Sequence, residues 1–482
     1  MKYRTKYLTI CLLAMGAFTG CQQDFIELSD PNRVFSGNYI NDAASLKSAL
    51  TADYNTLQPI YNGPYQAFGD VVSDNSTGQI GAPSYNVLDT FTYDSTNGTF
   101  AVIWNASYKS IAQSNLVIGK GAAIAMDETL KNRYIAEAKF IRAQNYFNLV
   151  QLFGDIPLVA TSIEDYHDSY NFGRRPVAEI YAQIEKDLNE AAAVLPASYS
   201  SSDLGRVTSG AANALLGKVY LTEKKYNEAL TALNKVTGYS LLSDFNSVFS
   251  TTNEMNNEII FAVRYNRVLQ AAPLPNIGSS FGIQMLPDNV TMAGSKGAKN
   301  NTEMPEWASL YSTGDKRAAI SVAFSAGGLT TPYYCAKFID AQATSATNAE
   351  NDWIVLRYAD VLLMKAEVLN ELNRTSEALA PYNEVRQRAN VSTLLVPPTQ
   401  SDFRTAVETE RRLELCLEGH RWFDLVRTGR ALVVMDAHFA ANTGTGKYYA
   451  TKPVIQSKHL LFPIPFTEIQ TNPKLLPNNP GY

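Results

Sequence analysis

The chain has 482 residues, a formal net charge of −5, 45% hydrophobic residues and 18% charged residues. This balance excludes an intrinsically disordered protein, and a chain of this length can bury a large core without disulfides. Basic runs interleaved with aromatic residues are missing, so nucleic-acid binding is not expected. The 27 Tyr and 4 His suit stacking against a ligand better than acid–base catalysis.

The first 21 residues have the order of an export signal. Three basic residues precede an apolar stretch at 8–18, which is too short to span a bilayer, and Gly20 leads into Cys21. The order resembles a bacterial lipobox. We therefore expect residues 1–20 to be removed and Cys21 to carry lipid, followed by a polar tether at 21–35. The alternative is a plain secretory signal with a chance cysteine.

Helical spacing of apolar residues predicts one helix over 42–57 and others over about 104–116 and 130–152. Between the first two, residues 59–100 are rich in Gly, Asn, Ser, Thr and Tyr and contain three prolines. This composition predicts a long loop region, and long ordered loops in compact domains are usually functional.

Further along, segments repeat the spacing of a tetratricopeptide unit, which is a pair of antiparallel helices with small residues where they cross. The clear units are 209–236 and 358–385, and weaker candidates are 131–195 and 402–436. Such pairs bury their faces only against neighbours. We therefore predict a mostly α fold in which the helical pairs pack as one scaffold.

A large insertion separates the two clear units. Residues 238–350 are rich in Gly, Asn and Ser with short apolar runs, which predicts loops, short strands and a helix or two. Residues 437–482 are also irregular and rich in proline. We expect 36–482 to form a single domain, with the insertions 59–100 and 238–350 laid over its helices.

Signatures of catalysis and metal binding are missing from the sequence, which has no HExxH, GxSxG or CxxC motif. The four histidines lack metal-ligand spacing, so we expect neither a cofactor nor a metal ion. Besides Cys21, the cysteines left after signal removal are Cys335 and Cys416. They lie far apart in the sequence and do not suggest a disulfide framework.

Residues 410–424 are dense in charged side chains. Glu410, Glu414 and Glu418 share one face of a predicted helix, and a glycosidase uses two carboxylates about 5–10 Å apart. The neighbouring Arg411, Arg412 and Arg421 favour ion pairs instead. We therefore interpret the cluster as structural and predict a protein that is not an enzyme.

The same region, 410–427, resembles the signature helix of the SusD/RagB family, the surface lipoproteins of Bacteroidetes nutrient-uptake systems. Further stretches resemble the family in the same order and cover nearly all of the chain after the signal. These stretches are Trp104–Tyr108 with Asn115, Ala136–Ala143, Phe153–Pro157, Trp353–Met364, Phe462–Pro465 and Asn479–Tyr482.

The resemblance implies a binding protein that is anchored in the outer membrane by lipid on Cys21 and faces the exterior. Family members cap a SusC-like TonB-dependent transporter and hand it oligosaccharides or, in some branches, peptides. Their ligand face is built from loops over a repeat scaffold. The loop-rich ranges 59–100 and 238–350 agree with that arrangement.

Candidate ligand-binding residues lie in these two ranges. Sugar rings present apolar C–H faces that aromatic rings bury, while polar side chains bind the hydroxyls. Asp74 and Asn75 lie in a stretch that resembles a family segment lining the ligand face. The full set of expected ligand-binding residues is Asp74, Asn75, Tyr85, Tyr265, Phe281 and Trp307.

Three functions remain open at this point. The first is capture of glycans at the cell surface, and the second is capture of peptides by the same architecture, as in the RagB branch. The third is a protein–protein scaffold that uses the tetratricopeptide units. The aromatic, weakly charged insertions favour glycans over peptides.

Overall fold

A computed structural model describes residues 40–78, 81–267, 278–327 and 332–482. The expected signal, Cys21 and the tether at 21–35 lie outside these residues. Within the described part of the chain, no helix combines the length and apolarity needed to cross a bilayer.

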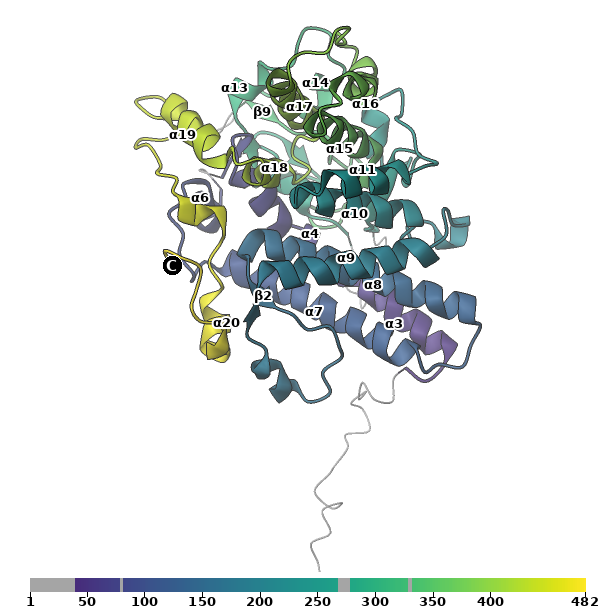
Figure 1. The fold of residues 1–482 in the computed structure, drawn as a ribbon. Helices are drawn as coiled ribbons and strands as arrows, with labels where there is room; N and C mark the ends of the chain where they lie inside the picture. The colour runs from purple at the N-terminus through teal and green to yellow at the C-terminus, as the bar shows by residue number, and fades with distance from the viewer. Residues whose placement is uncertain (1–39, 79–80, 268–277, 328–331) are drawn as a thin grey trace, which may run out of the picture.

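The scaffold is a series of helices in which each contacts the next, from α3 through α7, α8, α9, α10 and α11 to α15 (Figure 1). Helix α15 then contacts both α16 and α17. This arrangement confirms the predicted mostly α, tetratricopeptide-like fold class. The helices are α3 (Ala43–Asn55), α7 (Gly98–Gly121), α8 (Glu128–Phe153), α9 (Val177–Val194), α10 (Ser209–Thr222), α11 (Tyr226–Asn234), α15 (Tyr358–Glu371), α16 (Thr375–Arg388) and α17 (Gln400–Glu414).

Local sequence explains where these helices start and how closely they cross. The side chain of Asp127 accepts a hydrogen bond from the Leu130 backbone N–H at 2.8 Å and caps α8. At the crossing of α10 and α11, a Cβ on Gly217 would lie 2.6 Å from the Leu233 side chain. Only glycine permits this approach, which is why a small residue occupies that position of the repeat.

The region predicted as a fourth helical pair, 402–436, has a different arrangement. Helix α17 contacts α15 and α16, which makes it a third helix of the preceding unit. It is followed by α18 (Arg421–Arg427) and α19 (Ala431–Asn442), which contact each other. The apolar periodicity of 402–436 thus marks three helices and not two.

The large insertion begins and ends at one antiparallel ribbon. Strand β4 (Ile259–Val263) pairs with β10 (Trp353–Arg357), and all ten residues are buried. Between them lie short elements, as the composition predicted. They are α12 (Phe281–Gln284), β5 (Thr291–Met292), β6 (Ser295–Lys296), β7 (Thr302–Glu303), α13 (Pro305–Ala308), α14 (Ala318–Ser321), β8 (Ala323–Phe324) and β9 (Tyr333–Tyr334), and η5 (Asn246–Phe249) precedes the ribbon.

The range 59–100, predicted as a long loop, instead contains several short helices between its loops, and much of it is buried. A π-helical turn, η2, packs so closely on the turn that precedes α18 that a Cβ on Gly69 would lie 2.4 Å from the Gly419 Cα. The Gly419 N–H also donates a 3.0 Å hydrogen bond to Asp70. The elements of this range are α4 (Gln58–Tyr61), α5 (Pro64–Gln66), η2 (Ala67–Val71), β1 (Ser76–Thr77) and α6 (Pro83–Asp89).

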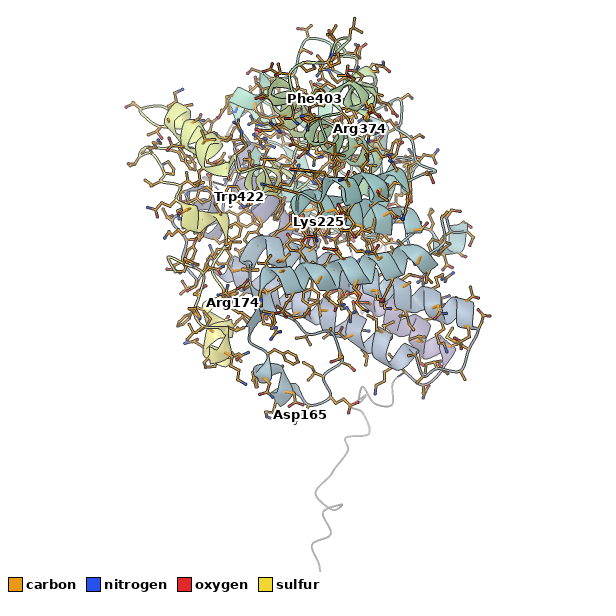
Figure 2. The ribbon with its side chains drawn as sticks, in the orientation of Figure 1. Asp165, Arg174, Lys225, Arg374, Phe403 and Trp422 are labelled. Carbon is orange, nitrogen blue, oxygen red and sulfur yellow. The ribbon has the colours of Figure 1, made fainter. Side chains whose placement is uncertain are left out.

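The C-terminal segment returns along the scaffold and is held by one buried tryptophan and one asparagine. Trp422 (Figure 2) lies 5.6 Å from Phe91 and 6.5 Å from Phe462, measured between ring centroids. Asn479 donates hydrogen bonds to the backbone carbonyls of Phe153 and Phe462. The remaining short elements are β2 (Ile156–Pro157), η3 (Tyr166–Asn171), β3 (Arg174–Arg175), η4 (Ser201–Asp203), η6 (Ser457–Leu460), α20 (Phe466–Thr471) and η7 (Pro473–Leu475).

Candidate functional site

The glutamates of the 410–424 cluster are buried in ion pairs, as interpreted from the sequence, but their partners differ from the expected ones. Glu414 accepts hydrogen bonds from Arg317 at 3.1 Å, from Arg357 at 2.5 Å and from Arg388. These arginines come from the insertion, from β10 and from α16. Burial would raise the pKa of Glu414, but the three guanidinium groups hold it well below its usual range. A carboxylate in this setting is a structural anchor and cannot reach a substrate.

The two polar residues expected to bind ligand, Asp74 and Asn75, are also buried in the ion-pair system. Asp74 accepts hydrogen bonds from Arg421 at 2.7 and 2.9 Å, and Asn75 accepts one from Arg412 at 2.7 Å. Burial works to raise the pKa of Asp74, but the two arginines lower it further than burial raises it. In this structure, Asp74 ties the segment before β1 to the start of α18 and Asn75 ties it to α17, so these side chains are committed to the protein and not to sugar hydroxyls.

Three of the four expected aromatic residues are buried as well. Tyr265 donates a 2.8 Å hydrogen bond to the Gln58 carbonyl, and its ring lies 5.8 Å from that of Phe281. Phe281 lies 5.1 Å from the Trp353 ring. Trp307 is fully buried next to Tyr311. These rings are internal anchors, which corrects the expectation that they are displayed to a ligand.

The two loop-rich ranges nevertheless form one continuous layer, because hydrogen bonds join them at several places. Asn62 accepts a 2.5 Å hydrogen bond from the Ser280 N–H, and Asn300 accepts one of 2.7 Å from the Ala82 N–H. Strands β1 and β7 pair antiparallel between the same two ranges. Tyr85, the one remaining residue of the set expected to bind ligand, lies on α6 in this layer and is half-buried. Its burial raises the pKa of its hydroxyl, which lies near Gly63.

An aromatic edge on this layer was missed by the sequence analysis. Phe324 on β8 is 62% exposed, and its ring lies 5.4 Å from that of half-buried Tyr333 on the paired strand β9. Strand β9 contacts β7, and Asn289 donates hydrogen bonds to Ser325 and Ala326 beside β8. A fixed and exposed aromatic pair of this kind can pack against the apolar face of a sugar ring.

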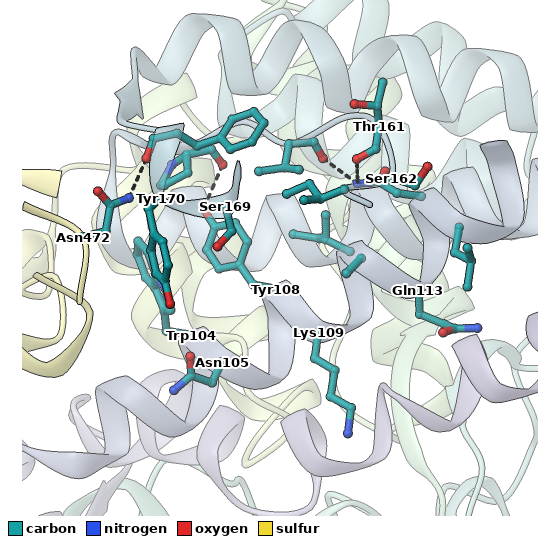
Figure 3. Close-up of a pocket in the computed structure, with 18 of the residues that line it drawn as sticks. Trp104, Asn105, Tyr108, Lys109, Gln113, Thr161, Ser162, Ser169, Tyr170 and Asn472 are labelled. Atoms are coloured by element: carbon teal, nitrogen blue, oxygen red, sulfur yellow. Dashed lines mark hydrogen bonds between the residues drawn. The ribbon is translucent and has the colours of Figure 1, made fainter. Parts of the chain in front are cut away.

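A separate cavity of about 510 Å³ lies on the outer face of α7 (Figure 3). The segment 157–172 and residues 468–475 of the C-terminal helices α20 and η7 form its other walls. Trp104 and Tyr108, which lie on the helix predicted over about 104–116, line this cavity. No group of three or more His, Cys, Asp or Glu side chains able to hold a metal ion occurs among the described residues.

With this geometry in place, comparisons with known proteins define the class. Residues 296–482 match the family model described as "SusD family", and residues 24–221 match the model described as "Starch-binding associating with outer membrane". Together the two ranges span most of the chain. The chain belongs to the SusD family, as the sequence motifs indicated.

Individual relatives match most or all of the chain. It is similar to "SusD-like protein P2" of Formosa agariphila, with 26% identity covering all of both chains. It is also similar to "Starch-binding protein SusD" of Bacteroides thetaiotaomicron, with 24% identity over 77% of this chain and 76% of that protein. A solved structure described as "Laminarin binding SusD-like protein" has 27% identity and a TM-score of 0.78, covering 92% of this chain and all of that one.

Proposed function

We propose that this protein captures oligosaccharides at the outer membrane and delivers them to a SusC-like TonB-dependent transporter, while it is anchored through lipid on Cys21. The match that carries the proposal is the one to a laminarin-binding protein across its full length, at 27% identity. The family model that covers residues 24–221 adds association with the outer membrane. The ligand itself is proposed to be a neutral glycan, with laminarin oligosaccharides as the first class to test.

The placement of the ligand rests on the layer that the two loop-rich ranges form. Tyr85 and the edge made by Phe324 and Tyr333 belong to that layer and are its proposed contacts. The layer is tied to the helices below by buried ion pairs such as those of Arg317 and Arg357 with Glu414. A rigid base supports capture, because a preorganised surface spends less binding energy on its own ordering.

The same ion pairs argue against the third candidate function, a protein–protein scaffold that uses the helical repeats. The insertion occupies a face of the helical repeats through Arg317 from the insertion and Glu414 from α17, both of which are fully buried. That face is therefore filled by the chain itself. The carboxylates considered for a hydrolase, Glu410, Glu414 and Glu418, are all held in buried ion pairs, which supports a binding role without catalysis.

Replacing Phe324 with alanine is expected to weaken glycan binding by about thirtyfold, since truncation of a central aromatic residue in an interface commonly costs about 2 kcal/mol. Tyr85→Ala is expected to act in the same direction. Isothermal titration with laminarin oligosaccharides, alongside other neutral hexasaccharides, measures the effect. The thermal midpoint of Phe324→Ala should stay close to that of the parent, because the side chain is mostly exposed.

The control for this experiment is Val433→Ala, which removes a similarly exposed apolar side chain on α19. It should leave the affinity unchanged. If Phe324→Ala and Tyr85→Ala both bind as tightly as the parent, the placement of the site is wrong. If the parent binds none of the oligosaccharides, the proposed function itself is wrong.

Substitution of Cys21 by alanine is expected to release the protein from the membrane fraction, because lipid on this residue is the proposed anchor. Fractionation and immunoblotting of cells that express each form measure the distribution. Cys11→Ala is the matched control, since it changes a cysteine that is removed with the signal. Retention of Cys21→Ala in the outer membrane at the parent's level would show that the anchor lies elsewhere.

A further inference from the structure

We propose that the cavity on the outer face of α7 is a second carbohydrate-binding site, distinct from the aromatic edge of the loop layer; this inference rests on the proposed glycan-binding function. Figure 1 shows α7 and β2 at one end of the molecule and β9 near the other, so the two places lie on different parts of the surface. A volume of about 510 Å³ is within the usual range for small-ligand pockets, which is roughly 300–1,000 Å³.

Helix α7 gives the cavity both an aromatic floor and a polar rim. Trp104, Tyr108 and Ile111 follow one another at spacings of four and three residues and line the floor. Asn105, Lys109 and Gln113 are spaced by four and form a parallel row on the neighbouring face of the helix. Trp104 is only 4% exposed and backs the floor, so half-buried Tyr108 is the ring of α7 that a ligand would contact, beside the row of hydrogen-bonding groups.

The opposite wall completes the aromatic surface. Tyr170, which is 39% exposed, and Phe172 come from the segment that crosses over α7. Figure 3 shows Trp104, Tyr108 and Tyr170 grouped toward one end of the cavity, with Thr161 and Ser162 toward the other. A sugar ring held between such rings would bury its C–H faces while its hydroxyls stay at the rim.

The walls are fixed by hydrogen bonds within the protein, so the cavity is preformed. Asn115 on α7 donates to the carbonyls of Val159 and Thr161 at 2.8 and 3.2 Å. Tyr108 donates to the Pro157 carbonyl at 2.8 Å, and Asn472 donates to the Phe172 carbonyl at the same distance. A flexible ligand gains affinity from a site that needs no ordering of its own.

The polar groups of the rim favour a neutral glycan over a peptide. They are mainly amides and hydroxyls, and Lys120 forms an ion pair with Glu164 across the rim at 3.4 Å. Strand β2, the strand that lines this cavity, has two residues and is already paired with β3. A peptide therefore finds no open strand edge to extend here, which is the usual way that an extended peptide docks on a sheet.

The test is the number of binding sites for laminarihexaose, measured by native mass spectrometry and isothermal titration on the mature chain. The parent should bind two equivalents. Tyr170→Ala should lose one of them or weaken one binding step at least tenfold, and Asn105→Ala should weaken the same step. Tyr220→Ala, which truncates a half-buried tyrosine on α10, is the control and should retain both.

The outcomes separate this inference from the proposed function. If Phe324→Ala abolishes binding and Tyr170→Ala matches the parent, the loop layer is the glycan site and the second site is refuted. If Tyr170→Ala weakens binding of short peptides and of no oligosaccharide, the cavity is a peptide site and the inference is overturned. A parent that binds none of the neutral hexasaccharides overturns both statements.

Discussion

Replacement of Glu414 by alanine is expected to lower the free energy of unfolding by about 3–5 kcal/mol, because it removes one partner from a buried ion-pair network. Glu414 is fully buried and accepts hydrogen bonds from Arg317, Arg357 and Arg388. Without it, these guanidinium groups keep their desolvation cost and lose a shared counter-charge. Urea denaturation near neutral pH, followed by circular dichroism, measures the change.

A surface ion pair provides the matched control. Glu377 in the first turn of α16 pairs with Arg374, the residue that caps the helix, and both side chains are exposed, so Glu377→Ala should leave the unfolding midpoint almost unchanged. Glu414→Gln separates charge from shape and should also destabilise strongly, since it keeps the volume and removes the negative charge. An unfolding curve for Glu414→Ala that overlays the parent's would show that the network does not hold the insertion on the helices.

The helical scaffold could be predicted from the sequence because its evidence is local. Apolar spacing and the small residue Gly217 identify α10 and α11, and the same pattern identifies α15 and α16. The range 59–100 gave no such periodicity. Its short helices are fixed by contacts with distant residues, such as the close approach of Gly69 to Gly419, and composition alone therefore suggested a loop.

The site was harder to predict, because burial depends on partners that are remote in the sequence. Asp74 looked available for a ligand, yet its partner Arg421 lies 347 residues further along the chain. Conversely, Phe324 is exposed and Phe281 is buried, although the sequence around Phe324 does not distinguish it from such buried aromatic residues. Residue type and loop composition located the layer, but the exposure of each ring had to come from the fold.

Glu303 gives the other large expected effect, a dependence of stability on pH. This residue on β7 is fully buried, and neither carboxylate oxygen has a hydrogen-bond partner among the described residues. Burial, with a smaller contribution from Cys416, raises the pKa of Glu303 well above its ordinary value of 4.5, and Lys337 only partly opposes the rise. The folded protein therefore keeps a proton on this residue over a pH range in which the unfolded chain has released it.

The sign of the effect follows from that difference. Below about pH 4.5, Glu303 is protonated in both the folded and the unfolded state, so its titration does not change the free energy of unfolding. Above that pH, the unfolded state has lost the proton and the folded state keeps it. The free energy of unfolding then falls by up to about 1.4 kcal/mol per pH unit. Glu303→Gln removes this loss. Relative to the parent, the variant should be nearly neutral at about pH 4.5 and should become progressively more stabilising as the pH rises toward about 8.

Urea denaturation at several pH values gives the free energy of unfolding of the parent and of Glu303→Gln. The difference between the two reports Glu303 alone, because the other titrating groups contribute equally to both proteins. Glu228→Gln, at an exposed position on α11, is the control and should give a difference that does not change with pH. A difference for Glu303→Gln that is equally flat would mean that Glu303 is ionised in the folded state. The buried carboxylate would then need a counter-charge, and Lys337 is already committed to Glu418 at 2.7 Å. The pH dependence therefore tests whether β7 carries a neutral, buried carboxyl group within the layer proposed to bind the ligand.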